Sequence, residues 1–341
     1  DGPTPSMGRH ADPMHPDDPF IRRVKDREKT EHDSANAWVD QIGKLNKADI
    51  DQRHTGNGAV ADVIQIGDRN KAEVDQDSNG QSRGDYAVIT TVGDENGARI
   101  RQNNTGNNFS DDNQADIQQG NDGSGAQFPG SGNTSEAYRS VASIDQDGED
   151  HRADINQYET NGSFASYNEA AIKQRGDNAN ARIDQDGDYN DASIYQTGLG
   201  LALEASSYQE GDFNDSRITQ EGEAHDAKVS QVGDYNAAEI VQLGGFDNDA
   251  SIMQEGDWNS GVTIQYGSFN DAETVQDGDY NSASILQDGV DNSGTILQDN
   301  DHNKASLEQL GIGNLAFISQ SGNDFANVQQ HGFSNSALVR Q

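Results

Sequence analysis

The 341-residue chain contains no cysteine, so it can form neither a disulfide framework nor a thiolate metal site. It has no apolar run near the roughly 18 residues of a membrane-spanning helix, and we expect no membrane insertion. Basic residues are few, 23 against 59 acidic ones, which gives a net charge of -36. Because phosphate binding needs basic patches, this balance excludes nucleic acid as an expected partner. Hydrophobic residues make up only 31% of the chain, a composition that is also typical of disorder.

A repeat of eleven residues argues against disorder, because random polar sequence has no period. Residues 276–298 contain the unit twice. Its pattern is Gln, any residue, Gly, any two residues, Asn, any residue, Ala or Gly, any residue, Ile, any residue, Gln. Asn281, Ala283, Ile285 and Gln287 occupy every second position, which predicts a β-strand with one face turned inward. The Gly, Asn and Asp residues between such segments favour a tight turn. Stacked strand-turn units predict an all-β fold, a β-solenoid with two strands in each coil.

The glutamine that closes each unit recurs from Gln41 to Gln341, with Thr91 in one of the slots. These positions predict about 25 short strands and about 12 coils, or roughly 60 Å of solenoid at the usual strand spacing. The solenoid domain is expected to cover residues 34–341. Insertions between units cluster before residue 175, so we expect the C-terminal half to be the more regular.

Residues 1–33 differ in composition and are expected to form an irregular N-terminal arm, Pro-rich and then basic. Five of the six prolines lie here, and the segment 20–29 carries a local charge of +3. Two interpretations stay open: a solvated charged linker, or an arm that docks on an acidic solenoid. The first residues contain no apolar signal-peptide core, which fits either a processed chain or a cytosolic one.

The inward amides and the turn glycines are the candidate structural sites. Buried amides are costly if unpaired, but amides at the same position of every coil can bond to one another as ladders. The proposed ladder residues are Gln65, Asn70, Gln76, Gln185, Asn190, Gln196, Gln231, Asn236, Gln242, Gln276, Asn281, Gln287, Asn292 and Gln298. The proposed turn glycines are Gly67, Gly187, Gly233, Gly256, Gly278 and Gly289.

Two further sets of residues are regular. One turn slot is aromatic in alternate units, which predicts a row on one edge of the solenoid: Tyr189, Phe213, Tyr235, Trp258 and Tyr280. The outward slot before the closing glutamine is apolar in neighbouring coils, and contiguous apolar residues mark contact surfaces. The proposed lateral contacts are Val241, Ile264 and Leu286 on one face, and Met253, Val275 and Leu297 on the other.

No catalytic constellation is found, and the sequence predicts no enzyme, no cofactor and no metal site. The histidines are scattered through turns without a regular Ser or Asp partner. His10 and His15, with the aspartates around them, could bind a metal only on a rigid scaffold, which the arm does not offer. The remaining Asp residues occupy outward or turn slots, where solubilising charge is expected.

The pattern Q-x-G-x-x-N-x-A-x-[IV]-x-Q resembles the curlin repeat of curli-type bacterial amyloid fibre subunits. It is matched by Gln65, Gly67, Asn70, Ala72, Val74 and Gln76, again by Gln185, Gly187, Asn190, Ala192, Ile194 and Gln196, and by the unit from Gln276 to Gln287. The resemblance covers about nine-tenths of the chain. It implies a secreted protein, exported unfolded through an outer-membrane channel, which polymerises with the help of a nucleator into fibres of the biofilm matrix.

The expected function is therefore structural, as a subunit of an extracellular cell-surface fibre. The last repeat closes at Gln341 without a polar cap, and an open strand edge is a template for another chain. We expect copies to assemble head to tail into a homopolymer for biofilm and adhesion. The alternative is a monomeric acidic β-solenoid that binds ions or a surface ligand.

Overall fold

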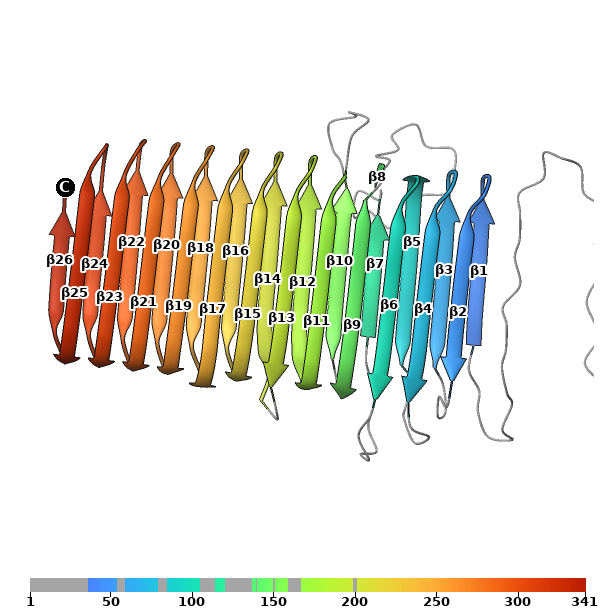
Figure 1. The fold of residues 1–341 in the computed structure, drawn as a ribbon, viewed down its shortest axis with the longest axis horizontal. Coiled ribbons are helices and arrows are strands. Elements are labelled where there is room, and N and C mark those ends of the chain that lie inside the picture. The colour runs from blue at the N-terminus through green and yellow to red at the C-terminus, as the bar shows by residue number, and fades with distance from the viewer. Residues whose placement is uncertain are drawn as a thin grey trace, which may run out of the picture.

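The protein forms a β-solenoid of two parallel sheets that face each other (Figure 1). The computed structural model describes residues 36–53, 59–78, 85–104, 114–119, 137–138, 140–149, 151–158, 167–198 and 201–341. These residues form 26 strands and no helix. The arm predicted for residues 1–33 lies outside the described residues.

Consecutive strands alternate between the two sheets, apart from β8 (Ala137–Tyr138). The first sheet consists, in order, of β1 (Asn36–Ile42), β3 (Val60–Ile66), β5 (Tyr86–Asp94), β7 (Gln114–Gln119), β10 (Arg152–Tyr158), β12 (Ala179–Asp186), β14 (Leu203–Glu210), β16 (Asp226–Val232), β18 (Asp249–Glu255), β20 (Asp271–Asp277), β22 (Ser293–Asp299), β24 (Leu315–Gln320) and β26 (Ser336–Arg340). The second sheet consists of β2 (Lys47–Arg53), β4 (Lys71–Ser78), β6 (Gly97–Asn104), β9 (Val141–Glu149), β11 (Glu169–Asp177), β13 (Asp191–Gly198), β15 (Asp215–Glu223), β17 (Ala237–Phe246), β19 (Ser260–Ser268), β21 (Ser282–Val290), β23 (Lys304–Ile312) and β25 (Phe325–Phe333).

Leaving out β8, the two sheets hold the 25 strands that the closing glutamines predict, and the solenoid fold is confirmed. Neighbouring strands pair in parallel with equivalent repeat positions opposite each other, for example Gln185 with Gln209 and Gln196 with Gln220. The repeat pattern did not predict β8, which lies in the insertion before β9 and pairs with β5.

The core is a thin layer in which each strand buries its Ala and Ile side chains between the sheets. Ile172, Ile194 and Ile218 lie on adjacent strands at the same level, each about 1% exposed. The apolar layer is interrupted where Thr263 and Thr274 occupy the isoleucine slot, and two separate core clusters result. Both threonine hydroxyls are buried without a hydrogen-bond partner, which lowers the stability of this level of the core.

Candidate functional site

The closing glutamines form a hydrogen-bonded ladder inside each sheet. The Nε2 of Gln254 donates to Oε1 of Gln276 at 2.8 Å, and the Nε2 of Gln276 donates to Oε1 of Gln298 at 2.9 Å. Most of these Nε2 groups also donate to a backbone carbonyl at the start of the preceding strand in the opposite sheet, as Gln276 does to Ser260 at 3.1 Å. One side chain therefore connects coil to coil and sheet to sheet.

The structure brings all the proposed ladder glutamines into such bonds. In the second sheet they join Gln76 to Gln102, Gln196 to Gln220, Gln242 to Gln265 and Gln287 to Gln309, and in the first sheet Gln41 to Gln65, Gln185 to Gln209, Gln231 to Gln254 and Gln298 to Gln320.

The ladder of the first sheet is broken at one coil, because Thr91 stands between Gln65 and Gln119. Thr91 is fully buried and its Oγ1 has no hydrogen-bond partner. The Oε1 of Gln119 is likewise buried and receives no hydrogen bond. A slot filled by threonine thus leaves buried polar atoms of the ladder unsatisfied.

The asparagines form a second kind of ladder at the turns. The Oδ1 of Asn190 accepts the backbone N–H of Asn214 at 2.9 Å, and its Nδ2 donates to the carbonyl of Gly211 at 2.7 Å. Similar bonds involve Asn70, Asn236 and Asn292. At Asn281 the pattern is incomplete: Oδ1 accepts from Asn303, but Nδ2 has no hydrogen-bond partner.

Glycine is required in the turns by both conformation and space. Gly187 has φ +115°, and a Cβ on it would lie 2.2 Å from the carbonyl oxygen of Gly211 in the next turn. A side chain there would therefore prevent the coils from stacking. The other predicted turn glycines also have positive φ: Gly67 (114°), Gly233 (113°), Gly256 (104°), Gly278 (113°) and Gly289 (137°).

The aromatic residues lie in one stack along the edge where the chain passes from the first sheet to the second. The ring centroids of Tyr189, Phe213 and Tyr235 are 4.8 Å apart in turn, Tyr235 and Trp258 are 4.3 Å apart, and Trp258 and Tyr280 are 6.1 Å apart. Tyr167 and His302 extend the row at its two ends, at 4.9 and 5.1 Å.

The backbone of this row is left-handed, which the sequence did not indicate. Tyr189, Phe213 and Tyr235 each have φ 59°. For a residue with a side chain this region costs about 1–2 kcal/mol, whereas a stacked ring pair contributes about 0.5–1.5 kcal/mol. Stacking therefore offsets much of the cost of a turn that brings bulky residues into a glycine-like conformation.

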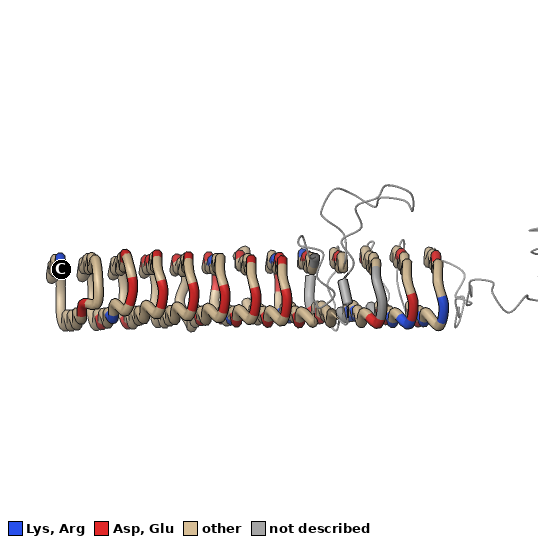
Figure 2. The backbone as a smooth tube through the Cα atoms, turned by 90° about the horizontal axis from the view of Figure 1, so that it is seen from above, with Lys and Arg blue, Asp and Glu red and all other residues tan. Residues whose placement is uncertain are grey.

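Aspartates form a further row beside the rings. The backbone N–H of Asp188 donates to Oδ1 of Asp212 at 2.9 Å, and that of Asp212 donates to Oδ1 of Asp234 at 2.8 Å. The series continues through Asp257, Asp279 and Asp301. Figure 2 looks down on these turns and shows acidic residues recurring from coil to coil. These side chains are turn-forming acceptors as well as solubilising charges.

Residues 168–198, 203–233, 245–273 and 289–322 match the family model of the curlin associated repeat. This part of the chain consists of curlin repeats. The matched ranges lie between β11 and β24, in the half of the solenoid where units follow one another most regularly. Comparison with curated proteins finds no match to this chain.

The proposed lateral contacts of this curlin-repeat protein lie in register on neighbouring strands. On the second sheet Val241 is opposite Ile264, which is opposite Leu286. We call this set the face stripe. On the first sheet Met253, Val275 and Leu297 are aligned in the same way. Met253 is 48% exposed, whereas the other five are only partly exposed.

Two histidines occupy the turn slot that asparagine fills in other coils. His225 is fully buried, and its Nδ1 accepts the backbone N–H of Asn248 at 3.2 Å. His151 is buried too and accepts from Ala179 at 3.3 Å. Burial lowers the pKa of both imidazoles, opposed at His225 by the carbonyls of Glu221 and Gly244 and by Asp247. The sequence showed only scattered histidines, because their alignment with asparagine depends on turn length.

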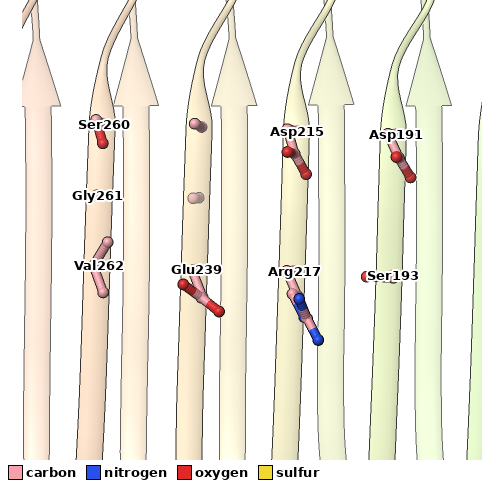
Figure 3. A pocket seen from close by; sticks show the side chains of 10 residues that line it. Asp191, Ser193, Asp215, Arg217, Glu239, Ser260, Gly261 and Val262 are labelled. Atoms are coloured by element: carbon pink, nitrogen blue, oxygen red, sulfur yellow. The ribbon is translucent and has the colours of Figure 1, made fainter.

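A depression of about 410 Å³ lies on the outer face of the second sheet, and Figure 3 shows side chains that line it. Its lining includes the short residues Ala237 and Gly261, with Asp191 and Asp215 toward one end. Burial raises the pKa of Asp191, and the neighbouring carboxylates of Asp215 and Glu169 raise it further. The lining combines carboxylates with the guanidinium group of Arg217.

The metal and membrane expectations can be compared only with the described part of the chain. Within it, no group of three or more His, Asp or Glu side chains is placed to hold a metal ion. The described residues also contain no helix long and apolar enough to cross a membrane. His10 and His15, with their neighbouring aspartates, lie outside the described residues.

Proposed function

We propose that this curlin-repeat protein is a structural subunit of an extracellular curli-like amyloid fibre, and that copies add head to tail for biofilm matrix and surface adhesion. The family and the fold are structural rather than catalytic, and curlin family members are extracellular fibre subunits. The observation that carries the proposal is the in-register stacking of coils, in which equivalent glutamines bond from coil to coil with one break, at Thr91 in the first sheet. Such a ladder continues across a junction if the next copy presents the same slots.

We propose that a second copy adds at the terminal strands of the described solenoid. β26 pairs with β24 and β25 pairs with β23, and no further described strand covers them. Amides such as those of Gln330 and Gln341 therefore reach the end of each ladder. By family resemblance we also propose an outer-membrane secretion channel and a nucleator as partners.

Electron microscopy of the purified chain after incubation tests the proposal. We expect unbranched filaments whose diffraction shows a reflection near 4.8 Å along the fibre axis, the spacing of stacked strands. A chain that stays monomeric at all concentrations, salt levels and pH values would instead favour the monomeric acidic solenoid. In that case, titration with divalent cations followed by calorimetry would test whether it binds ions.

A further inference from the structure

The edge opposite the aromatic stack carries its own row of exposed apolar side chains. It lies at the lower turns of Figure 1, where the chain passes from the second sheet to the first. We call it the lower-edge row. It consists of Phe246 (46% exposed), Phe269 (44%), Val290 (38%), Ile312 (46%) and Phe333 (75%).

The lower-edge row runs from Phe246 at the end of β17 to Phe333 at the end of β25, with Ser268 in register beside Val290 and Phe269 directly after it. Val290 is aligned with Ile312, and Ile312 with Phe333, on paired strands. Phe246 and Phe269 meet edge to face, with ring centroids 4.6 Å apart and planes at 81°. At the usual strand spacing the row is about 19 Å long.

The turns of the lower-edge row carry fewer carboxylates than turns on the upper edge. The five lower turns, 243–247, 266–269, 288–291, 310–313 and 331–334, contain three carboxylates. Five turns on the upper edge, 186–189, 210–213, 232–235, 255–258 and 277–280, contain nine. Two copies of a chain with a net charge of -36 can therefore approach along the lower edge with much less repulsion than along the upper edge.

From this asymmetry we infer that the lower-edge row is a lateral contact between fibres and that its partner is the same row of a second copy. The inference rests on the proposed fibre. A second copy brings an uncharged row of equal length, and a two-fold contact pairs the row with itself.

The area of the lower-edge row indicates whether it can hold together single subunits or only assembled fibres. A strip about 19 Å long and one turn wide covers roughly 200 Å² per copy, well below the ~800 Å² per partner of a stable complex. A single pair of subunits therefore does not dimerise through it. Subunits aligned in two fibres present the row many times over, and the contacts reinforce one another.

The test compares two double variants from the same coils. Ile312→Ser with Phe333→Ser removes two members of the lower-edge row. Leu315→Ser with Leu338→Ser removes two equally apolar side chains, 53% and 62% exposed, from the outer face of the first sheet. Fibres of the parent and of both variants are compared by electron microscopy and by the fraction that sediments at low speed.

We expect the lower-edge variant to form single filaments and to lose most of the low-speed fraction, while the control bundles as the parent does. Added salt should increase bundling of the parent and of the control but not of the lower-edge variant, because salt screens charge without restoring an apolar contact. Equal bundling in all three proteins, or equal loss in both variants, overturns the lateral contact while leaving the fibre intact. A parent that forms no filaments defeats the proposed function itself.

Discussion

Replacing Thr91 by Gln should repair the one break in the glutamine ladder of the first sheet. The new amide would fill the slot between Gln65 and Gln119, whose backbones are already in register with residue 91. Its Nε2 can donate to the Oε1 of Gln119, which is now buried without a donor. Satisfying a buried polar atom of this kind is worth about 1–3 kcal/mol. Since 1.36 kcal/mol is a factor of ten, local opening of this coil should become roughly 5- to 150-fold rarer.

Hydrogen exchange of peptides from β5 and β7 measures this opening, which a global melting temperature would average over many coils. The matched control is Thr91→Val, which removes the unpartnered hydroxyl at constant shape without adding a ladder bond. We expect Thr91→Gln to slow exchange in both strands and Thr91→Val to change it much less. Equal exchange in Thr91→Gln and the parent would show that the ladder does not stabilise the coil, and the reasoning would fail.

Three other outcomes are expected. Gln276→Ala removes three hydrogen bonds, two of them buried, and should slow assembly followed by dye binding. Ser284→Ala loses one half-buried hydroxyl contact and should assemble like the parent. Acid and salt should both shorten the lag before fibres appear. Burial raises the folded-state pKa values of Asp226 and Asp249, and neighbouring carboxylates raise that of Asp249 further. The free-energy penalty of folding with these two groups charged therefore disappears as the pH falls toward the ordinary pKa near 3.8. The stability that neutral His225 contributes is complete above its unfolded-state pKa of about 6.5 and is lost as the pH falls below that value. His225→Asn should therefore flatten the pH dependence of the urea midpoint between about pH 7.5 and 5. An unchanged profile would contradict this role.

The face stripe remains a separate proposal for lateral association. Its three side chains are only partly exposed, so replacing all of them by Ser should reduce bundling less than the lower-edge variant does. Counting filaments per bundle in electron micrographs would check this order, and a larger effect from the face stripe would reverse it.

The strands, their order and the inward residues could be predicted from the sequence because they depend on a period that every unit repeats. Gln185 and Gln209 bond because they occupy the same slot of paired strands, and Tyr189 stacks on Phe213 because both stand four residues after a closing glutamine. Only local spacing is needed for either inference.

The features that the sequence did not reveal depend on backbone conformation or on irregular segments. The hydrogen bond from the Asp188 backbone to Asp212 requires a particular turn, which composition alone does not specify. The left-handed conformation at Tyr189 runs against the preference of aromatic residues. β8 lies in an insertion that has no counterpart in other units, so no period could have predicted its pairing with β5.

The alternation of strands between two sheets also limits how the length of this chain can change. Loss or duplication of a pair of units removes or adds one full coil, and every later strand keeps its sheet and its edge. Loss of a single eleven-residue unit would instead shift all later strands to the opposite sheet. The aspartates and rings of the later coils would then face the side that the lower-edge row occupies now. Gains and losses in even numbers of units are therefore the changes that keep each later strand on its sheet and each later turn on its edge.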